Sequence, residues 1–217
     1  LKDGFPVFSG AASGLGLLQT PPLDLKQVEI IKGSSSTLYG GGAIAGLVNL
    51  ISKTPEKERD FSIHLNGTTG KGLDVNSFFG QKFNKVGTTV FASYNRNWAY
   101  DPSDVGFTAI PKFDRFVLNP KLFLYLSENT DFNFGINSMI ENRLGGDMEY
   151  VKGKGNDEHS YFERNKTQRH SSQLTFEHRF DKQNKLNVKN SVTYFTRKIE
   201  IPDFKFLVGF HYVDVPV

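Results

Sequence analysis

The sequence predicts a mainly β chain, in which a short N-terminal segment is followed by long antiparallel strands that run up and down. From residue 61 to the end of the chain, apolar side chains alternate with polar ones, and this period is typical of strands with two different faces. Several of these runs exceed ten residues, while strands of soluble proteins commonly have about five or six. The connections between the runs are alternately short and long.

The composition favours strands and excludes several classes of function. The 217 residues include 20 Phe and 8 Tyr but only 2 Met and 1 Trp, and aromatic side chains are enriched in strands. A net charge of +3 with scattered basic residues does not indicate a nucleic-acid partner. The absence of Cys excludes disulfides and thiolate metal sites. No apolar run reaches the length of about 18 residues that a membrane-spanning helix needs.

Residues 28–53 predict a strand, a glycine turn, one helical turn and a second strand. The first strand is β-branched at Val28, Ile30 and Ile31 and ends at Lys32, and the second apolar run ends at Lys53. The segment 34–36 consists of serines, which are good N-caps for the short helical turn. Positive φ angles or close backbone approach are expected at the glycines, which are Gly33, Gly40, Gly41, Gly42 and Gly46.

The pattern of this stretch resembles the C-terminal half of the plug domain of TonB-dependent outer-membrane receptors. The matching residues are Glu29, Lys32-Gly33, Leu38-Tyr39-Gly40, Ala43-Ile44, Gly46, Val48-Asn49 and Lys53, preceded by Leu1, Asp3-Gly4 and Pro6. Two positions depart from the family pattern. Ser34 stands where the family usually has Pro, and Ala45 stands where it often has Gly.

This resemblance implies a plug that lies inside a transmembrane β-barrel of about 22 strands. We expect residues 1–55 to be the C-terminal half of the plug domain and residues 56–217 to be the N-terminal portion of the barrel. On this interpretation the chain is a fragment of a longer receptor, and the first half of the plug and the segment that contacts TonB are absent from it. A fragment with two open sheet edges is expected to be stable only within the whole receptor, in detergent or in an oligomer.

A charged hinge at residues 54–60 separates the two parts, and eight strands are predicted after it. They lie near residues 61–66, 73–83, 90–98, 116–126, 132–141, 174–180, 186–197 and 204–212. The alternation has exceptions: Phe78, Phe91 and Phe195 fall on the polar face, and Arg96 falls on the apolar face.

The lengths of the connections predict the orientation of the strands. Short connections lie near residues 84–85, 128–130 and 181–184, and long ones at about 99–112 and 144–166. Outer-membrane barrels have short periplasmic turns and longer extracellular loops. We therefore expect the two long loops to face the outside of the cell.

A soluble antiparallel sandwich is the alternative fold, because one apolar and one polar face would also suit it. Long strands with charges on one face and aromatic residues on the other are better explained by a wide, water-filled barrel.

The sequence predicts no catalytic, cofactor or metal site. The glycines of 40–46 lack the Lys-Ser/Thr that a phosphate-binding loop requires, and none of the five histidines forms a metal-ligand pair with a neighbour. Aromatic residues in the long loops could stack on a flat ligand or pack the loops against themselves. The ligand-loop candidates are Tyr100, Tyr150, His159, Tyr161 and Arg164. By resemblance, the candidates for the plug motif and for plug–barrel contacts are Glu29, Lys32, Gly33, Tyr39, Gly40, Gly46 and Asn49.

The resemblance implies an outer-membrane active transporter of a Gram-negative bacterium, and not an enzyme. It would take up a ferric siderophore or haem, with cobalamin, glycans and peptides as the other ligand classes of the family. The implied partners are TonB, outer-membrane lipid and a small-molecule nutrient, without nucleic acid. A soluble β-sandwich binding module remains the alternative from another class.

Overall fold

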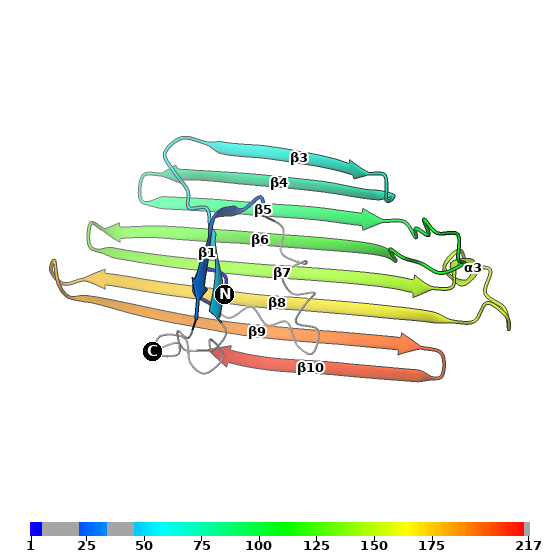
Figure 1. Cartoon of the computed structure of the whole chain (residues 1–217). Helices are drawn as coiled ribbons and strands as arrows, with labels where there is room; N and C mark the ends of the chain where they lie inside the picture. The colour runs from blue at the N-terminus through cyan, green and yellow to red at the C-terminus, as the bar shows by residue number, and fades with distance from the viewer. Residues whose placement is uncertain (6–21, 34–45, 215–217) are drawn as a thin grey trace.

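The chain folds into two antiparallel sheets, which the computed structural model describes for residues 1–5, 22–33 and 46–214. A two-stranded sheet pairs β1 (Leu25–Lys32) with β2 (Gly46–Ser52). The other sheet has eight strands in the order of the sequence, each paired with the next one along the chain (Figure 1). These strands are β3 (Asp60–Thr68), β4 (Gly72–Phe83), β5 (Val86–Asn97), β6 (Lys112–Ser127), β7 (Thr130–Gly146), β8 (Phe162–Arg179), β9 (Lys185–Ile201) and β10 (Phe204–Asp214).

The predicted strands are confirmed, but the predicted bounds of the second long loop, 144–166, are wrong. β7 continues to Gly146 and β8 begins at Phe162, because these two residues are the last pair of the β7–β8 ladder. The loop that remains, residues 147–161, contains one helical turn, α3 (Met148–Val151), which the sequence did not predict. The helical turn predicted within residues 34–45 lies outside the described residues. In the part of the chain that the structure describes, no helix is long and apolar enough to cross a membrane.

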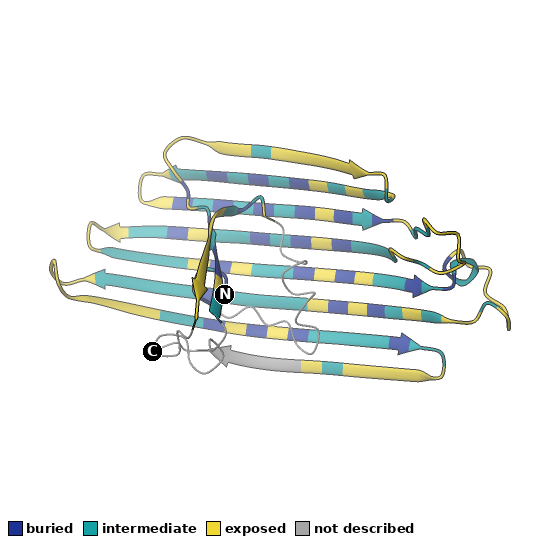
Figure 2. Ribbon diagram, viewed as in Figure 1, coloured by how far each residue is buried: buried dark blue, intermediate teal, exposed yellow. Residues whose placement is uncertain are grey.

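The large sheet has an outer face that is mainly apolar. Residues in register across neighbouring strands share a face, so each row of partners can be followed from strand to strand. One row of the outer face contains Val86, Leu124, Phe132, Phe176 and Val188. Alternate residues point to the opposite, inner face, and they account for the alternating burial along β4–β9 (Figure 2).

Two of the exceptions to the alternation, Phe78 and Phe91, belong to the core beneath the small sheet. Phe78 and Phe91 lie on the inner face, where they cluster with Val117 and Met139, and each of the four is at most 4% exposed. Leu23, which is separated from β1 by Asp24, packs against this cluster. Apolar residues on an otherwise polar face therefore mark the place where the N-terminal segment covers the sheet.

The small sheet crosses the strands of the large one on its inner face (Figure 1). Lys32, at the end of β1, pairs with Gly46, at the start of β2, and the backbone at position 46 requires glycine. The φ angle of Gly46 is 122°, and a Cβ atom there would lie 2.7 Å from the carbonyl oxygen of Ile31. No other residue fits this close approach without strain.

Candidate functional site

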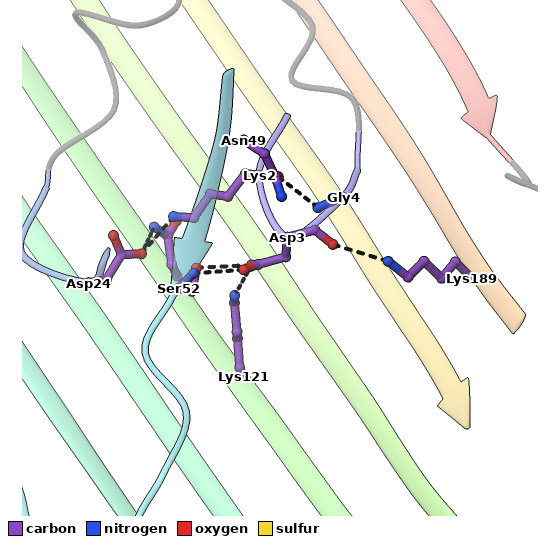
Figure 3. A network of polar contacts seen from close by, with 9 residues as sticks. Lys2, Asp3, Gly4, Asp24, Asn49, Ser52, Lys121 and Lys189 are labelled. Atoms are coloured by element: carbon purple, nitrogen blue, oxygen red, sulfur yellow. Dashed lines mark hydrogen bonds and ion pairs between the residues drawn. The ribbon is translucent and has the colours of Figure 1, made fainter. Parts of the chain in front are cut away.

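Asp3 is the centre of the contacts between the N-terminal segment and the inner face of the large sheet. Its carboxylate accepts hydrogen bonds from the backbone N–H of Ser52, at 2.7 Å, and from the Ser52 hydroxyl, at 2.9 Å. It also forms an ion pair with Lys121, which projects from β6 (Figure 3). Asp3 thus connects the end of β2 to the large sheet.

The pKa of Asp3 reflects this environment. Burial by itself would raise the pKa of this carboxyl group, but the Lys121 ammonium and the Ser52 donors hold it below its ordinary value. The carboxylate is consequently charged at neutral pH, where it pairs with Lys121.

Asp24 makes a second connection. Its Oδ2 atom accepts from Lys2 Nζ at 2.6 Å and from Asn119 Nδ2, on β6, at 3.2 Å. Lys2 and Asp24 are almost fully buried, with side chains 7% and 5% exposed. The pair therefore joins the start of the chain to the residues before β1, and Asn119 joins both to the large sheet.

Lys189 makes a third connection, from β9. Its ammonium lies 3.4 Å from the carbonyl oxygen of Asp3 and 5.5 Å from the centre of the Phe5 ring (Figure 3). The adjacent backbone N–H of Gly4 donates to Asn49 Oδ1 at 3.1 Å. A cleft of about 1110 Å³ opens beside these contacts, between the N-terminal segment and the inner face of β6–β9.

The predicted motif residues lie partly in this network. Asn49 is buried; besides accepting from Gly4, it donates from Nδ2 to the Glu29 carboxylate at 2.9 Å, so these two candidates contact each other across the β1–β2 ladder. Lys32 is exposed at the end of β1, next to Gly33, whose φ angle is 90°. Tyr39 and Gly40 lie outside the described residues. A contact of Glu29 or Lys32 with the barrel wall stays a prediction.

The lysines and acids that hold the small sheet in place were not among the predicted site residues. In the sequence Asp3 belongs only to the motif resemblance, and nothing local distinguishes Lys121 and Lys189 from the other polar residues of alternating strands. Both lysines contact Asp3, from which Lys121 is 118 residues and Lys189 is 186 residues away in the sequence. Only the folded chain therefore brings these residues together.

Four arginines gather farther along the inner face, toward the long loops. They occupy three neighbouring rows on β6–β9: Arg169 in the first, Arg115 and Arg197 in the second, and Arg143 in the third. The only acidic side chain in these rows on the inner face of β5–β9 is Glu141, opposite Arg115.

Glu141 balances only part of this charge. Its Oε2 atom accepts from Arg115 Nε at 2.7 Å and lies 2.6 Å from Arg115 Nη2, while its Oε1 atom lies 3.3 Å from Arg143 Nε. Both guanidinium groups also lie about 5 Å from the centre of the Phe113 ring, at 5.2 and 5.0 Å. The arginine cluster (Arg115, Arg143, Arg169 and Arg197) is thus a preorganised surface with an excess of positive charge.

The two long loops pack against each other at the same end of the sheet. Phe107 forms a bridge with Asp147, and the backbone N–H of Met148 donates to the carbonyl of Gly106 at 2.9 Å. Asp147 also caps α3 by accepting from the backbone N–H of Glu149 at 2.8 Å. One carboxylate therefore organises the start of the 147–161 loop.

His159 closes this loop. Its Nδ1 atom lies 2.8 Å from Asp147 Oδ2. The hydrogen bond to Asp147 raises the pKa of His159, and the same bond lowers the pKa of Asp147. The imidazole therefore retains its proton, and its attachment to Asp147, to a higher pH than an isolated histidine would.

The other predicted ligand-loop residues do not form one site but lie in three different places. Tyr150 stacks on Phe162 with ring centres 4.6 Å apart, and Tyr161 tilts against Phe107 at 6.1 Å, so these aromatic residues pack the loops against themselves. Arg164 lines a hollow of about 530 Å³ together with Tyr150. Tyr100 lies apart, beneath the ammonium of Lys71 in the β3–β4 turn. Among the described residues, no group of three or more His, Asp or Glu side chains could hold a metal ion.

The pairing of His159 with Asp147 predicts a pH dependence of loop order. Because the folded pKa of His159 is raised, its contribution is complete below its unfolded pKa of about 6.5 and is lost as the pH rises through the folded pKa. The lowered pKa of Asp147 removes the contribution again only in strong acid, as the pH falls through that value. Hydrogen exchange of residues 147–161 in the folded protein should accordingly become faster from mildly acidic to alkaline pH, beyond the intrinsic increase.

The variant Asp147→Asn keeps a capping side chain but loses the charge, and it should lower the pKa of His159 toward its ordinary value in an NMR titration. Asp157→Asn, which changes an exposed acid of the same loop, is the matched control. An unchanged titration of His159 in Asp147→Asn would contradict the assignment.

Comparisons with known proteins agree with this architecture. Residues 1–47 match the family model of the TonB-dependent Receptor Plug Domain. Over 75 residues the chain is 36% identical to the vitamin B12 transporter BtuB of Vibrio vulnificus, and over 40 residues it is 48% identical to the metal-pseudopaline receptor CntO of Pseudomonas aeruginosa. These matches cover 35% and 18% of this chain, and they span only 12% and 6% of the lengths of the two relatives.

Solved structures extend the similarity to the large sheet. The ferric-catecholate import receptor Fiu of E. coli K12 matches with a TM-score of 0.62 at 12% identity, over 88% of this chain and 34% of that one. The ferric enterobactin receptor PfeA of P. aeruginosa matches with a TM-score of 0.62 at 15% identity, over 90% of this chain and 32% of that one. At these identities the likeness shows the fold.

A small N-terminal sheet held by buried polar contacts on the inner face of a long-stranded antiparallel wall defines a plug and part of the larger barrel that surrounds it. The match of its first 47 residues to the plug domain, together with this shared fold, supports a fragment of a TonB-dependent receptor. The division at residues 55 and 56 stays a prediction.

Proposed function

We propose that the receptor to which this chain belongs takes up an anionic metal chelate, a ferric siderophore, across the outer membrane of a Gram-negative bacterium, with energy supplied through TonB. The observation that carries the proposal is the arginine cluster, in which four arginines lie in three neighbouring rows of the described inner face and two of them, Arg115 and Arg143, pair with the one carboxylate of these rows, Glu141. Transport of this kind requires binding and movement of the plug but no chemistry on the ligand.

The geometry of the cluster suits such a ligand. Arginine presents planar, bidentate donors to oxygen anions and retains its charge when it is partly buried. Its position at the end that bears the long loops is where a ligand from outside would enter. The similarity to the metal-pseudopaline receptor CntO and the fold shared with Fiu and PfeA support a metal chelate as cargo.

Cobalamin is the second candidate, favoured by the 36% identity to the vitamin B12 transporter BtuB over 75 residues. Haem is a weaker alternative. The loop candidates His159 and Tyr161 are residue types that can bind haem iron, but Nδ1 of this histidine is already bonded to Asp147.

Uptake of radioactive iron tests the proposal in cells that express the full-length receptor. The probes are a ferric tris-catecholate, which is anionic, a neutral ferric hydroxamate, and labelled cobalamin and haem in separate arms. We expect the catecholate to be taken up and a protonophore to abolish its uptake. The double variant Arg143→Gln/Arg197→Gln should reduce uptake at subsaturating concentration about tenfold or more, because charge-assisted hydrogen bonds are lost.

The matched control is Arg179→Gln/Lys185→Gln, which removes the same charge at the opposite end of the sheet, on β8 and β9, where Arg179 is half exposed. Equal losses in both variants, or catecholate uptake that is insensitive to both, would overturn the role of the cluster. Uptake of cobalamin alone would instead establish the second candidate.

A further inference from the structure

Basic side chains form a belt on the outer face of the large sheet, on the side opposite the plug. In one row, Arg96, Asp114, Asn142, Lys166 and Lys198 are partners on successive strands. In the next row toward the long loops, Lys112, Leu144, Arg164, Glu200 and Lys205 are partners. The outer belt is defined here as the six basic residues of these rows, which are Arg96, Lys112, Arg164, Lys166, Lys198 and Lys205.

Two carboxylates leave most of this charge unbalanced. Asp114 lies 3.6 Å from Arg96, and Glu200 lies 2.7 Å from Lys198 and 3.5 Å from Arg164. Lys112 and Lys166 form no ion pair with any residue in the described part of the chain. Lys166 is exposed, and together with Lys112 and Arg164 it lines a hollow of about 240 Å³ on this face.

The belt begins where the apolar surface ends. On β6 the outward residues from Phe116 to Leu126 are almost all large and apolar, and the ten residue steps between these two positions span about 33 Å. At a strand tilt of about 40° it covers about 25 Å of the membrane normal, which is the height of the apolar band of an outer-membrane barrel. Asp114 and Lys112 follow immediately, so the belt lies at the level of the lipid headgroups on the side of the long loops.

Polar residues on β8 lie next to the outer belt, on its side away from the long loops. Below Lys166 the outward positions of this strand are Gln168, His170 and Ser172, of which His170 is bonded to Ser138 at 2.8 Å. These side chains offer donors and acceptors to hydroxyl groups rather than to acyl chains. The combination of cations above and hydrogen-bonding groups below is the chemistry that a phosphorylated sugar headgroup requires.

We infer that the outer belt binds the phosphate groups of a phosphorylated glycolipid in the outer leaflet of the membrane. The occupant is a lipid rather than free phosphate, because the belt directly borders a surface that requires acyl chains. It is a phosphate rather than a carboxylate bearer because a doubly charged group best balances clustered Lys and Arg side chains. The inference rests on the proposed outer-membrane location, but not on the identity of the transported ligand.

Native mass spectrometry of the full-length, detergent-solubilised receptor tests the inference by titration with diphosphoryl lipid A. The comparison arms are monophosphoryl lipid A and inorganic phosphate. The triple variant Lys112→Gln/Arg164→Gln/Lys166→Gln should bind diphosphoryl lipid A at least about tenfold more weakly, because each cation near an anionic lipid contributes to the attraction. The matched control Lys57→Gln/Lys154→Gln/Lys182→Gln removes three exposed charges elsewhere and should bind normally.

Heat-modifiable migration in gels establishes that each variant is folded, and Lys112→Arg/Lys166→Arg, which keeps the charges, should retain binding. Equal affinity of the two triple variants, equal affinity for both lipids, or binding of inorganic phosphate alone at comparable strength would each overturn the inference. Iron uptake in the belt variant is measured separately. Normal uptake with lost lipid binding supports the belt, whereas lost uptake with normal lipid binding concerns only the proposed function.

Discussion

Replacement of Glu141 by glutamine is expected to lower the free energy of unfolding of the receptor by about 3–5 kcal/mol, the cost of removing one partner from a buried ion pair. The Glu141 side chain is 2% exposed, and in the described inner-face rows that hold the four arginines it is the only carboxylate. Glutamine keeps the shape of the side chain and one acceptor, so the loss would come from the charge. Thermal denaturation of the purified receptor in detergent, followed by heat-modifiable gel migration, measures the effect.

The control for this variant is Glu177→Gln, near the other end of β8. Glu177 pairs with Arg179 and Lys185, whose side chains are 49% and 61% exposed, so this change should cost less than about 1 kcal/mol. The double variant Glu141→Gln/Arg115→Gln should recover much of the stability, because it removes the excess charge together with its partner. A double variant less stable than Glu141→Gln alone would refute the electrostatic explanation.

Replacement of Asp3 by asparagine is expected to loosen the plug without unfolding the barrel. Asp3 has a φ angle of 55°, which asparagine tolerates, so the backbone should be preserved. The change leaves the Lys121 ammonium, whose side chain is 12% exposed, without its carboxylate and should cost about 1.5–3 kcal/mol. Protection of the Ser52 amide against hydrogen exchange should fall about ten- to a hundredfold, since this amide donates to Asp3.

The pH dependence gives an independent check on Asp3. Because the pKa of its carboxyl group is lowered in the folded state, its stabilisation is present above its unfolded pKa of about 3.9 and is lost as the pH falls through the folded value. Asp3→Asn should remove that part of the acid sensitivity. The matched control is Asp60→Asn, because Asp60 pairs with Lys53 and its side chain is 49% exposed. Equal changes in Ser52 protection in the two variants would show that Asp3 does not anchor the plug.

The alternation of apolar and polar residues predicted the strands and their faces well, because each strand of a barrel wall has two faces. The two faces meet different environments and therefore require different side chains. The outward rows of β5–β9 follow this requirement with few exceptions. The exceptions were informative in the folded chain. Phe78 and Phe91 lie beneath the plug, and Arg96 belongs to the outer belt.

The loops were harder to predict, since their ends depend on hydrogen-bond ladders rather than on alternation. β7 and β8 continue past the apolar band through Leu144 and Arg164, so periodicity gives no signal for their last pairs. Similarly, Tyr150 and Tyr161 could have faced a ligand, and only their contacts with Phe162 and Phe107 show that they stabilise the loops.

The amino-acid sequence by itself determined the class of protein, the order of the strands and the two-sided character of the wall, because these depend on local motifs and on a period of two residues. Only the tertiary structure decided which polar residues act together. Asp3 and Lys121 are 118 residues apart, and Arg115 and Arg197 come from different strands. Ion pairs and charge clusters on a barrel wall depend on register across several strands, and the register exists only when the strands have paired.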